Sequence, residues 1–131
     1  MSNKKLGNDF EAQFCEILFE EGFWCHNLAQ NQAGQPADVI AVRNGKAYLI
    51  DCKVCSNGKF ALSRMEDNQD LAMELWRRCG NGDGWFAIRL EDKSIYMIPH
   101  YIIKAMLKKN KSDMSEFEIT MNGYTILEWI G

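Results

Sequence analysis

The chain has 131 residues, of which 47% are hydrophobic, and its formal net charge is -3. This length suffices for one globular domain that buries a core without disulfides or metals, so we expect a single domain over residues 1–131. No apolar window is long enough to span a membrane and no signal-peptide core follows the N-terminus, so we expect a soluble, unexported protein. The acidic balance excludes binding driven by a general positive charge, and a nucleic-acid partner would need a local basic surface or a bound cation.

The first part of the chain predicts a helix, a strand and a loop. Apolar residues recur at helical spacing from Leu6 to Leu18, and Gly22 is a natural end for this helix. The apolar and aromatic run at 23–28 predicts a short strand. The polar composition of residues 29–36 predicts a loop.

A hairpin is predicted around the dipeptide Asn44-Gly45. This dipeptide separates two apolar runs, residues 37–42 and 47–53. It is the strongest short-range hairpin signal, because both central residues of a type I′ turn need a positive φ. We therefore expect these two strands to pair antiparallel.

A second helix is predicted after a loop over residues 55–62. Ser63 and Glu66 have the spacing of a capping box at the start of this helix. The residues that predict its apolar stripe are Met65, Leu71, Ala72, Leu75 and Trp76. The glycine-rich run "GNGDG" then predicts the end of the helix.

The last third of the chain predicts a strand pair, a short helix and a small hairpin. The strand pair is expected over residues 85–90 and 94–99, and the helix over 101–109, where it ends in lysines. Asn122-Gly123 predicts a C-terminal hairpin by the same turn signal as before.

Two acids and a lysine gather at one end of the central hairpin. Asp51 and Lys53 are separated by one residue in a strand, so their side chains point to the same side. Pairing through the turn brings Asp38 near Asp51. Two close carboxylates repel each other unless a cation or a proton lies between them, so this set predicts a Mg²⁺ or Mn²⁺ site beside a fixed positive charge.

Such a site suits phosphodiester hydrolysis. The ion polarises a phosphoryl oxygen and lowers the pKa of a bound water, while Lys53 orients that water or stabilises the charge on phosphorus. An acid and a lysine alone in a strand are more often a solvated salt pair. The apolar strands around them, Asp38 upstream and Glu11 in the first helix make the set more specific.

This pattern resembles the PD-(D/E)xK nucleases. It consists of Glu11, then Asp38 in "PAD", then an apolar strand that ends in "DCK" at 51–53. The segment "GKAYLIDCKVCSNGKFALSRMEDNQ" is similar to RecU-like Holliday junction resolvases, and archaeal Hjc-type resolvases share the helix-one acid and the spacings. The resemblance implies an α/β fold with a mixed central sheet flanked by helices, and a homodimer that uses Mg²⁺ and binds branched DNA.

The resemblance also implies the metal ligands. Asp38 and Asp51 would be the metal-binding carboxylates, the backbone carbonyl of Cys52 a further ligand, and Glu11 an outer or second-metal ligand. Asp51 stands where these resolvases usually carry Glu, and the loop at 29–36 is short for the basic stalk of the RecU-like enzymes.

The remaining roles are implied in the same way. Lys53 would position water or stabilise charge, and Gln69 would orient water or contact the phosphate. Lys59 and Arg64 flank the loop after the catalytic strand, where contact with DNA phosphates and simple solvation are equally well supported.

Other residues that could carry chemistry favour structural roles. Cys52 and Cys55 form a C-x-x-C pair, but no further ligands complete a zinc site. His26 and His100 are isolated in the sequence and fit structural histidines.

The sequence therefore predicts a Mg²⁺-dependent, structure-specific endonuclease of the resolvase type, cytoplasmic, from a phage or a bacterium. The alternatives are another PD-(D/E)xK nuclease that cuts flaps, forks or duplex DNA, and a catalytically inactive DNA-binding module on the same fold.

Overall fold

The computed structural model describes residues 3–28 and 37–131, and its centre is a six-stranded sheet in the order β1-β2-β3-β5-β6-β8. All neighbouring strands are antiparallel except β3 and β5, which are parallel. The six strands are β1 (Trp24–Asn27), β2 (Val39–Arg43), β3 (Lys46–Val54), β5 (Trp85–Arg89), β6 (Ile95–Pro99) and β8 (Tyr124–Thr125). A separate antiparallel pair is formed by β4 (Lys59–Ala61) and β7 (Asp113–Ser115).

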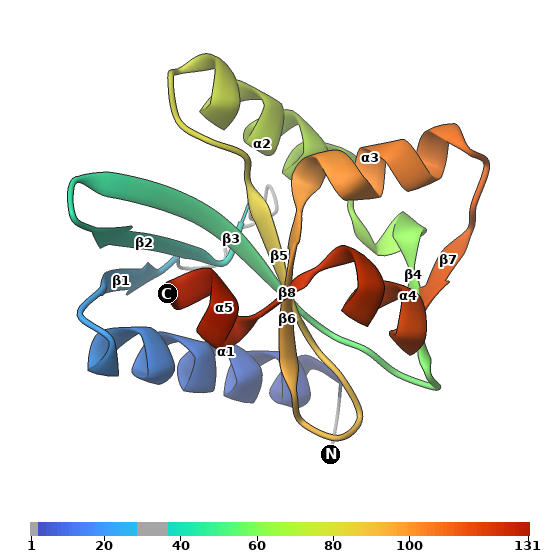
Figure 1. The fold of residues 1–131 in the computed structure, drawn as a ribbon, viewed down its shortest axis with the longest axis horizontal. Helices are drawn as coiled ribbons and strands as arrows, with labels where there is room; N and C mark the ends of the chain where they lie inside the picture. Colours follow the sequence, from blue (N-terminus) through green and yellow to red (C-terminus); the bar gives the residue numbers. More distant parts are fainter. Residues whose placement is uncertain (1–2, 29–36) are drawn as a thin grey trace.

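Helices cover both faces of the sheet (Figure 1). One face carries α1 (Asn3–Glu20) and α5 (Ile126–Ile130), and the other carries α2 (Asp67–Arg78), α3 (His100–Lys108) and α4 (Glu116–Asn122). A short 3-10 helix, η1 (Leu62–Arg64), precedes α2. This mixed sheet between helices agrees with the predicted α/β class. Within the described ranges, no helix has the length and apolarity that crossing a bilayer requires.

Each face of the sheet has its own hydrophobic core. Under α1 the core contains Phe10, Phe14 and Leu18, which recur every four residues and are fully buried. On the other face, Phe86 of β5 packs in one cluster with Met73 of α2. Each such side chain contributes about 1.5–3 kcal/mol through removal of apolar surface from water. These two layers fix α1 and α2 on opposite sides of β3.

The predicted central hairpin is confirmed. β2 and β3 pair antiparallel with Arg43 opposite Lys46, and Val39 lies opposite Ile50. Asn44 and Gly45 adopt φ values of 53° and 74°, as a type I′ turn requires. The predicted pair of strands over 85–90 and 94–99 is also present, as β5 and β6.

The predicted start of the second helix is wrong. Ser63 lies in η1, and the helix begins at Asp67 with Glu66 as its N-cap. The backbone N–H of Glu66 donates to Oε1 of Gln69 at 3.0 Å. The capping role that the sequence assigned to Ser63 therefore falls to the residue three positions later.

The predicted apolar stripe of the second helix is also partly wrong. Leu71 and Leu75 are 69% and 61% exposed, whereas Gln69 and Met73 face the sheet. Residues four apart share one helix face, so a face that includes Gln69 and Met73 leaves the two leucines on another. The buried side chain on this face is the amide of Gln69, and a pattern of apolar residues cannot predict the burial of a polar one.

The predicted C-terminal hairpin is wrong as well. Gly123 has φ -118°, outside the range that a type I′ turn needs, and it ends α4. A Cβ at this glycine would lie 2.5 Å from the side chain of Ile98, so close packing explains the residue. Ser115 and Thr125 each receive a hydrogen bond from a backbone N–H three residues later and begin α4 and α5.

Candidate active site

The candidate site lies where β2 diverges from β3 and leaves the rest of β3 with an open edge. The backbone N–H of Asp38 donates to the carbonyl of Ile50 at 3.1 Å, the last contact of this ladder. The backbone N–H of Cys52 then donates to Oδ2 of Asp38 at 2.7 Å. The carboxylate of Asp38 thus replaces a backbone partner beside the "DCK" segment, as the hairpin pairing predicts.

Asp51 is held from two sides. It is 1% exposed, and Nζ of Lys53 lies 3.0 Å from its Oδ2. The side-chain amide of Gln69 donates to its Oδ1 at 3.3 Å. Asp51 and Lys53 therefore point to the same side of β3, toward α2, and Gln69 reaches them from the first turn of that helix.

The site carries more negative than positive charge. Burial and the nearby charge of Asp38 raise the pKa of Asp51 well above its usual range, and Lys53 opposes this only in part. Burial and Asp38 also raise the pKa of Glu11 to about 7. Asp38 thus acts on both Asp51 and Glu11 beside a single lysine, and this is the electrostatic condition that a bound cation relieves.

The donor set fits a hard divalent cation such as Mg²⁺ or Mn²⁺. Oδ2 of Asp51 is buried and has the ion pair with Lys53, but among the described residues it accepts no hydrogen bond of good geometry. The N–H of Cys52 points to Asp38, and a residue's N–H and C=O share one edge of a strand, so its carbonyl points to the same open edge. Carboxylate and carbonyl oxygens are the ligands these ions prefer.

Glu11, Asp38 and Asp51 do not form a compact cluster of ligand atoms. Within residues 3–28 and 37–131, the one group of three acidic, histidine or cysteine side chains whose ligand atoms all lie within 4.8 Å is Asp70, Glu74 and His100. Glu11, Asp38 and Asp51 do not meet that distance. Their mutual pKa effects place Glu11 within electrostatic reach, which suits an outer position.

The group at Asp70 has its own positive partners. Nε2 of His100 lies 2.7 Å from Oδ1 of Asp70, and Nζ of Lys104 lies 3.0 Å from Oδ2. Burial raises the pKa of Asp70, but the hydrogen bonds from Lys104 and His100 outweigh it and lower that pKa below its usual range. His100 is therefore satisfied structurally, as its isolation in the sequence predicts.

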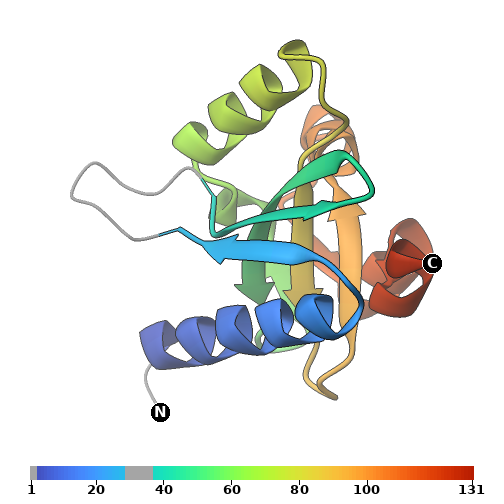
Figure 2. The ribbon, with the colours of Figure 1, turned by 90° about the vertical axis from the view of Figure 1, so that its left-hand side faces the viewer.

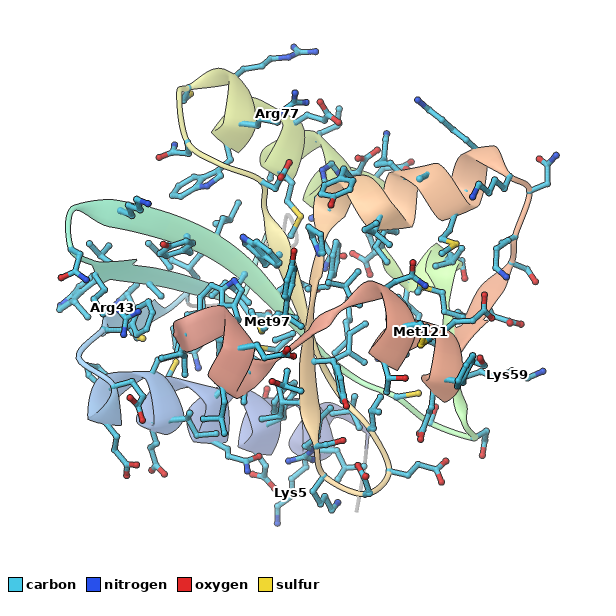
Figure 3. All side chains as sticks on the ribbon, in the orientation of Figure 1. Lys5, Arg43, Lys59, Arg77, Met97 and Met121 are labelled. Carbon is cyan, nitrogen blue, oxygen red and sulfur yellow. The ribbon has the colours of Figure 1, made fainter. Side chains whose placement is uncertain are left out.

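The two residues predicted to contact DNA lie in different surroundings. Lys59 is exposed on β4 and projects away from the body of the molecule (Figure 3). Arg64 instead donates from Nη1 to the carbonyl of Val54 at 2.6 Å, so its guanidinium lies at the open edge of β3. Cys52 and Cys55 are buried free thiols, which agrees with structural roles. Residues 29–36, where the stalk of the RecU-like enzymes would lie, fall outside the described residues.

A family model described as archaeal Holliday junction resolvase (hjc) matches residues 2–126. The chain belongs to this family. It is 24% identical over 120 residues to the crossover junction endodeoxyribonuclease Hjc of Methanocaldococcus jannaschii, with 86% of each protein covered. Of the two resolvase types that the sequence resembles, the Hjc type is thus the one confirmed.

The structure of Hjc from Archaeoglobus fulgidus, a Holliday junction resolvase from an archaeal hyperthermophile, superposes with a TM-score of 0.73 at 20% identity. The match covers 95% of this chain and all of that chain, and it confirms the restriction-endonuclease-like fold. Both relatives are archaeal, and the bacterial or phage source stays a prediction.

Proposed function

We propose that this chain is a metal-dependent endodeoxyribonuclease that cleaves Holliday junctions. The observation that carries the proposal is the buried Asp51, paired with Lys53 and lying beside Asp38, in a chain of the Hjc family. The names of its relatives, a crossover junction endodeoxyribonuclease and a Holliday junction resolvase, support this substrate.

Asp38, Asp51 and the carbonyl of Cys52 would hold a Mg²⁺ or Mn²⁺ ion, with Glu11 as an outer ligand. When bound, the ion would polarise a phosphoryl oxygen and lower the pKa of a water. Lys53 is 13% exposed at its side chain, so its ammonium reaches the side from which a phosphate would approach while Asp51 fixes its position. It would stabilise negative charge that develops on the phosphate.

Gln69 acts on Asp51. Its Oε1 accepts from the N–H of Glu66 and its Nε2 donates to Asp51, so both ends of the amide have protein partners. The helix cap therefore fixes the amide, and the amide fixes the orientation of one metal-binding carboxylate. Gln69 is thus a positioning residue, where the sequence suggested contact with water or phosphate.

The enzyme should be a homodimer. Two nicks on opposite strands of a four-way junction are most simply made by two identical sites related by a two-fold axis. Leu71 and Leu75 supply a surface for this contact, because they are exposed one helical turn apart on α2, the helix that brings Gln69 to the site. Figure 2 shows α2 on the side of the sheet opposite α1.

A cleavage assay tests the activity. The wild-type protein should nick four-way junctions in Mg²⁺ or Mn²⁺, and should cut linear duplex and flap DNA of the same sequence more slowly. Cleavage of all three DNAs at equal rates would leave a less selective nuclease, and binding without cleavage would leave a DNA-binding module.

Light scattering tests the assembly. The wild-type protein should run as a dimer at micromolar concentration, and the double variant Leu71→Glu/Leu75→Glu should run as a monomer. The matched control is Phe117→Glu/Leu127→Glu, which replaces two exposed apolar residues, one on α4 and one on α5. A dimer lost only in the control would move the interface to that surface.

A further inference from the structure

A groove lies next to the candidate site, along the open edge of β3. The groove has a volume of about 230 Å³ and is lined by Leu6, Gly7, Cys52, Val54, Ser56 and Arg64. Cys52 links the two, because its N–H binds Asp38 and the same residue lines the groove. We propose that this groove binds the sugar-phosphate unit next to the scissile phosphate on the cleaved DNA strand. This proposal rests on the proposed function.

On α1, the groove residue Gly7 lies one helical turn from the site residue Glu11. Gly7 and Glu11 are four residues apart, so they lie on one face of the helix about 6 Å from each other. A strand held with its phosphate at Asp38 and Asp51 would therefore run on past Gly7. Cys52 on β3 and the helical turn from Gly7 to Glu11 on α1 thus place the groove next to the candidate site.

Gly7 has no packing reason to be glycine. It lies inside α1, where glycine weakens a helix relative to alanine. Beyond the helix's own backbone and its chain neighbours, no heavy atom lies within 4 Å of where its Cβ would be. Since no protein atom requires the absence of a side chain here, we infer that the space beside Gly7 serves the backbone of a ligand.

The groove offers a cation to a phosphate. Arg64 uses Nη1 to bind the carbonyl of Val54, and its other N–H groups make no hydrogen bond within residues 3–28 and 37–131. One donor fixes the guanidinium and the rest of its fork is available to an anion. The hydroxyl of Ser56, an exposed residue, is a further donor on the lining.

Arg89 adds a second positive charge nearby. It pairs in register with Val54 and is 8% exposed. Its Nη1 donates to Gln13 and its guanidinium lies over the ring of Phe10, but in the described ranges it has no carboxylate partner and its Nε no acceptor. A buried cation without an acid raises the local positive potential at this end of β3.

The apolar part of the lining fits the other half of the unit. Leu6 and Val54 present aliphatic surface, and Cys52 turns its side chain toward the core under α1. A deoxyribose has an apolar ring face that packs on such surface, whereas the phosphate next to it needs Arg64. One groove thus contains the two surfaces that one sugar-phosphate unit presents.

The first experiment replaces Gly7 with alanine. Gly7→Ala should raise the melting temperature, because alanine favours the helix, and should lower junction affinity and cleavage by roughly tenfold or more, because the methyl group occupies the strand's path. The matched control Asn8→Ala changes the next, exposed helix residue outside the groove and should raise stability without loss of cleavage. Wild-type activity, or a lower melting temperature, in Gly7→Ala would overturn the proposal.

The second experiment locates the phosphate. A set of junctions is prepared in which a neutral methylphosphonate replaces one phosphate at a different position around the cut, and their cleavage rates are compared. At one position next to the scissile phosphate, wild-type cleavage should fall about tenfold or more, and Arg64→Gln should lose nothing further there. If each methylphosphonate reduced cleavage by the same factor in Arg64→Gln as in the wild-type protein, the assignment would be overturned.

The two proposals can fail separately. If the wild-type protein cuts no junction in Mg²⁺ or Mn²⁺, the proposed function fails. Gel shifts in EDTA then still test the groove, because Gly7→Ala must weaken junction binding and Asn8→Ala must not.

Discussion

Adjacent residues of α2 join two ionic clusters of opposite character. Gln69 contacts Asp51, whose cluster with Glu11, Asp38 and Lys53 has three acids and one lysine. Asp70 contacts His100 and Lys104, so its negative charge is already matched. Burial and the charge of Asp38 raise the pKa values of Asp51 and Glu11 in the first cluster, whereas the hydrogen bonds from Lys104 and His100 lower that of Asp70 in the second. The direction in which the pKa values of the acids shift, more than the number of acids, distinguishes a site that needs a cation from one that stabilises the fold.

The largest difference between the clusters should come from removing one acid from each. Asp51→Asn should reduce cleavage by about a hundredfold to a thousandfold or more, and should raise the melting temperature because it removes a buried carboxyl that shares one lysine with Asp38. Asp70→Asn should keep cleavage near wild type and cost about 1–3 kcal/mol of stability, because His100 loses its charged acceptor. Junction cleavage and thermal unfolding measure both. Equal losses of activity would remove the distinction.

The lysines of the two clusters should differ next. Lys53→Ala should leave the fold and metal binding nearly intact but lower turnover by on the order of a hundredfold, the typical effect of losing a charge-stabilising donor. Lys104→Ala, the matched change at Asp70, should leave turnover unchanged. Single-turnover cleavage of a junction separates them, and near wild-type turnover of folded Lys53→Ala would indicate a structural salt pair.

Metal should stabilise one cluster only. Mg²⁺ at a hundred times its dissociation constant should stabilise the protein by about 2.7 kcal/mol through linkage, and EDTA should abolish cleavage. Asp38→Asn should remove this rise in melting temperature, whereas Asp70→Asn should keep it. Full cleavage in EDTA would contradict the metal site.

The smallest effect is a pH dependence of opposite sign in the two clusters. A carboxyl whose pKa is raised on folding binds protons more tightly in the folded state, so its stabilising effect is lost as pH rises from about 4.5 through the folded pKa of Glu11, about 7. The lowered pKa of Asp70 acts in the opposite direction, and its contribution is lost as pH falls below 3.8. In EDTA, Glu11→Gln should flatten the first slope in denaturant titrations. An unchanged slope would show that Glu11 does not titrate in this range.

The approach of Asp38 to the "DCK" segment could be predicted from the sequence, because it depends on the local contacts of one hairpin. The turn at Asn44-Gly45 and the strand alternation were enough to bring Asp38 beside Asp51. The groove beside the site was not predictable in the same way, because Gly7, Ser56 and Arg64 come from three segments whose approach depends on the whole fold.

The C-terminal region shows where turn signals mislead. Asn122-Gly123 carries the same dipeptide as the central turn, but Gly123 is required by its closeness to Ile98. Ser115 with Glu118 was a readable capping box, and it identifies the helix that the structure contains. Helix-start signals before and after a possible hairpin turn deserve more weight than the dipeptide alone.

The local nature of the β2–β3 hairpin also governs the order in which the site assembles. A β-hairpin forms in about 1–10 μs, whereas contacts between residues distant in sequence close later. Asp38 and Asp51 can therefore meet before α1 and α2 dock on the sheet, and Glu11 and Gln69 join them afterwards. An isolated hairpin is only marginally stable in water, so the two acids separate again until the parallel pairing of β3 with β5 secures them. By this reasoning we expect the candidate metal ligands to be among the first groups to meet during folding and among the last to be held.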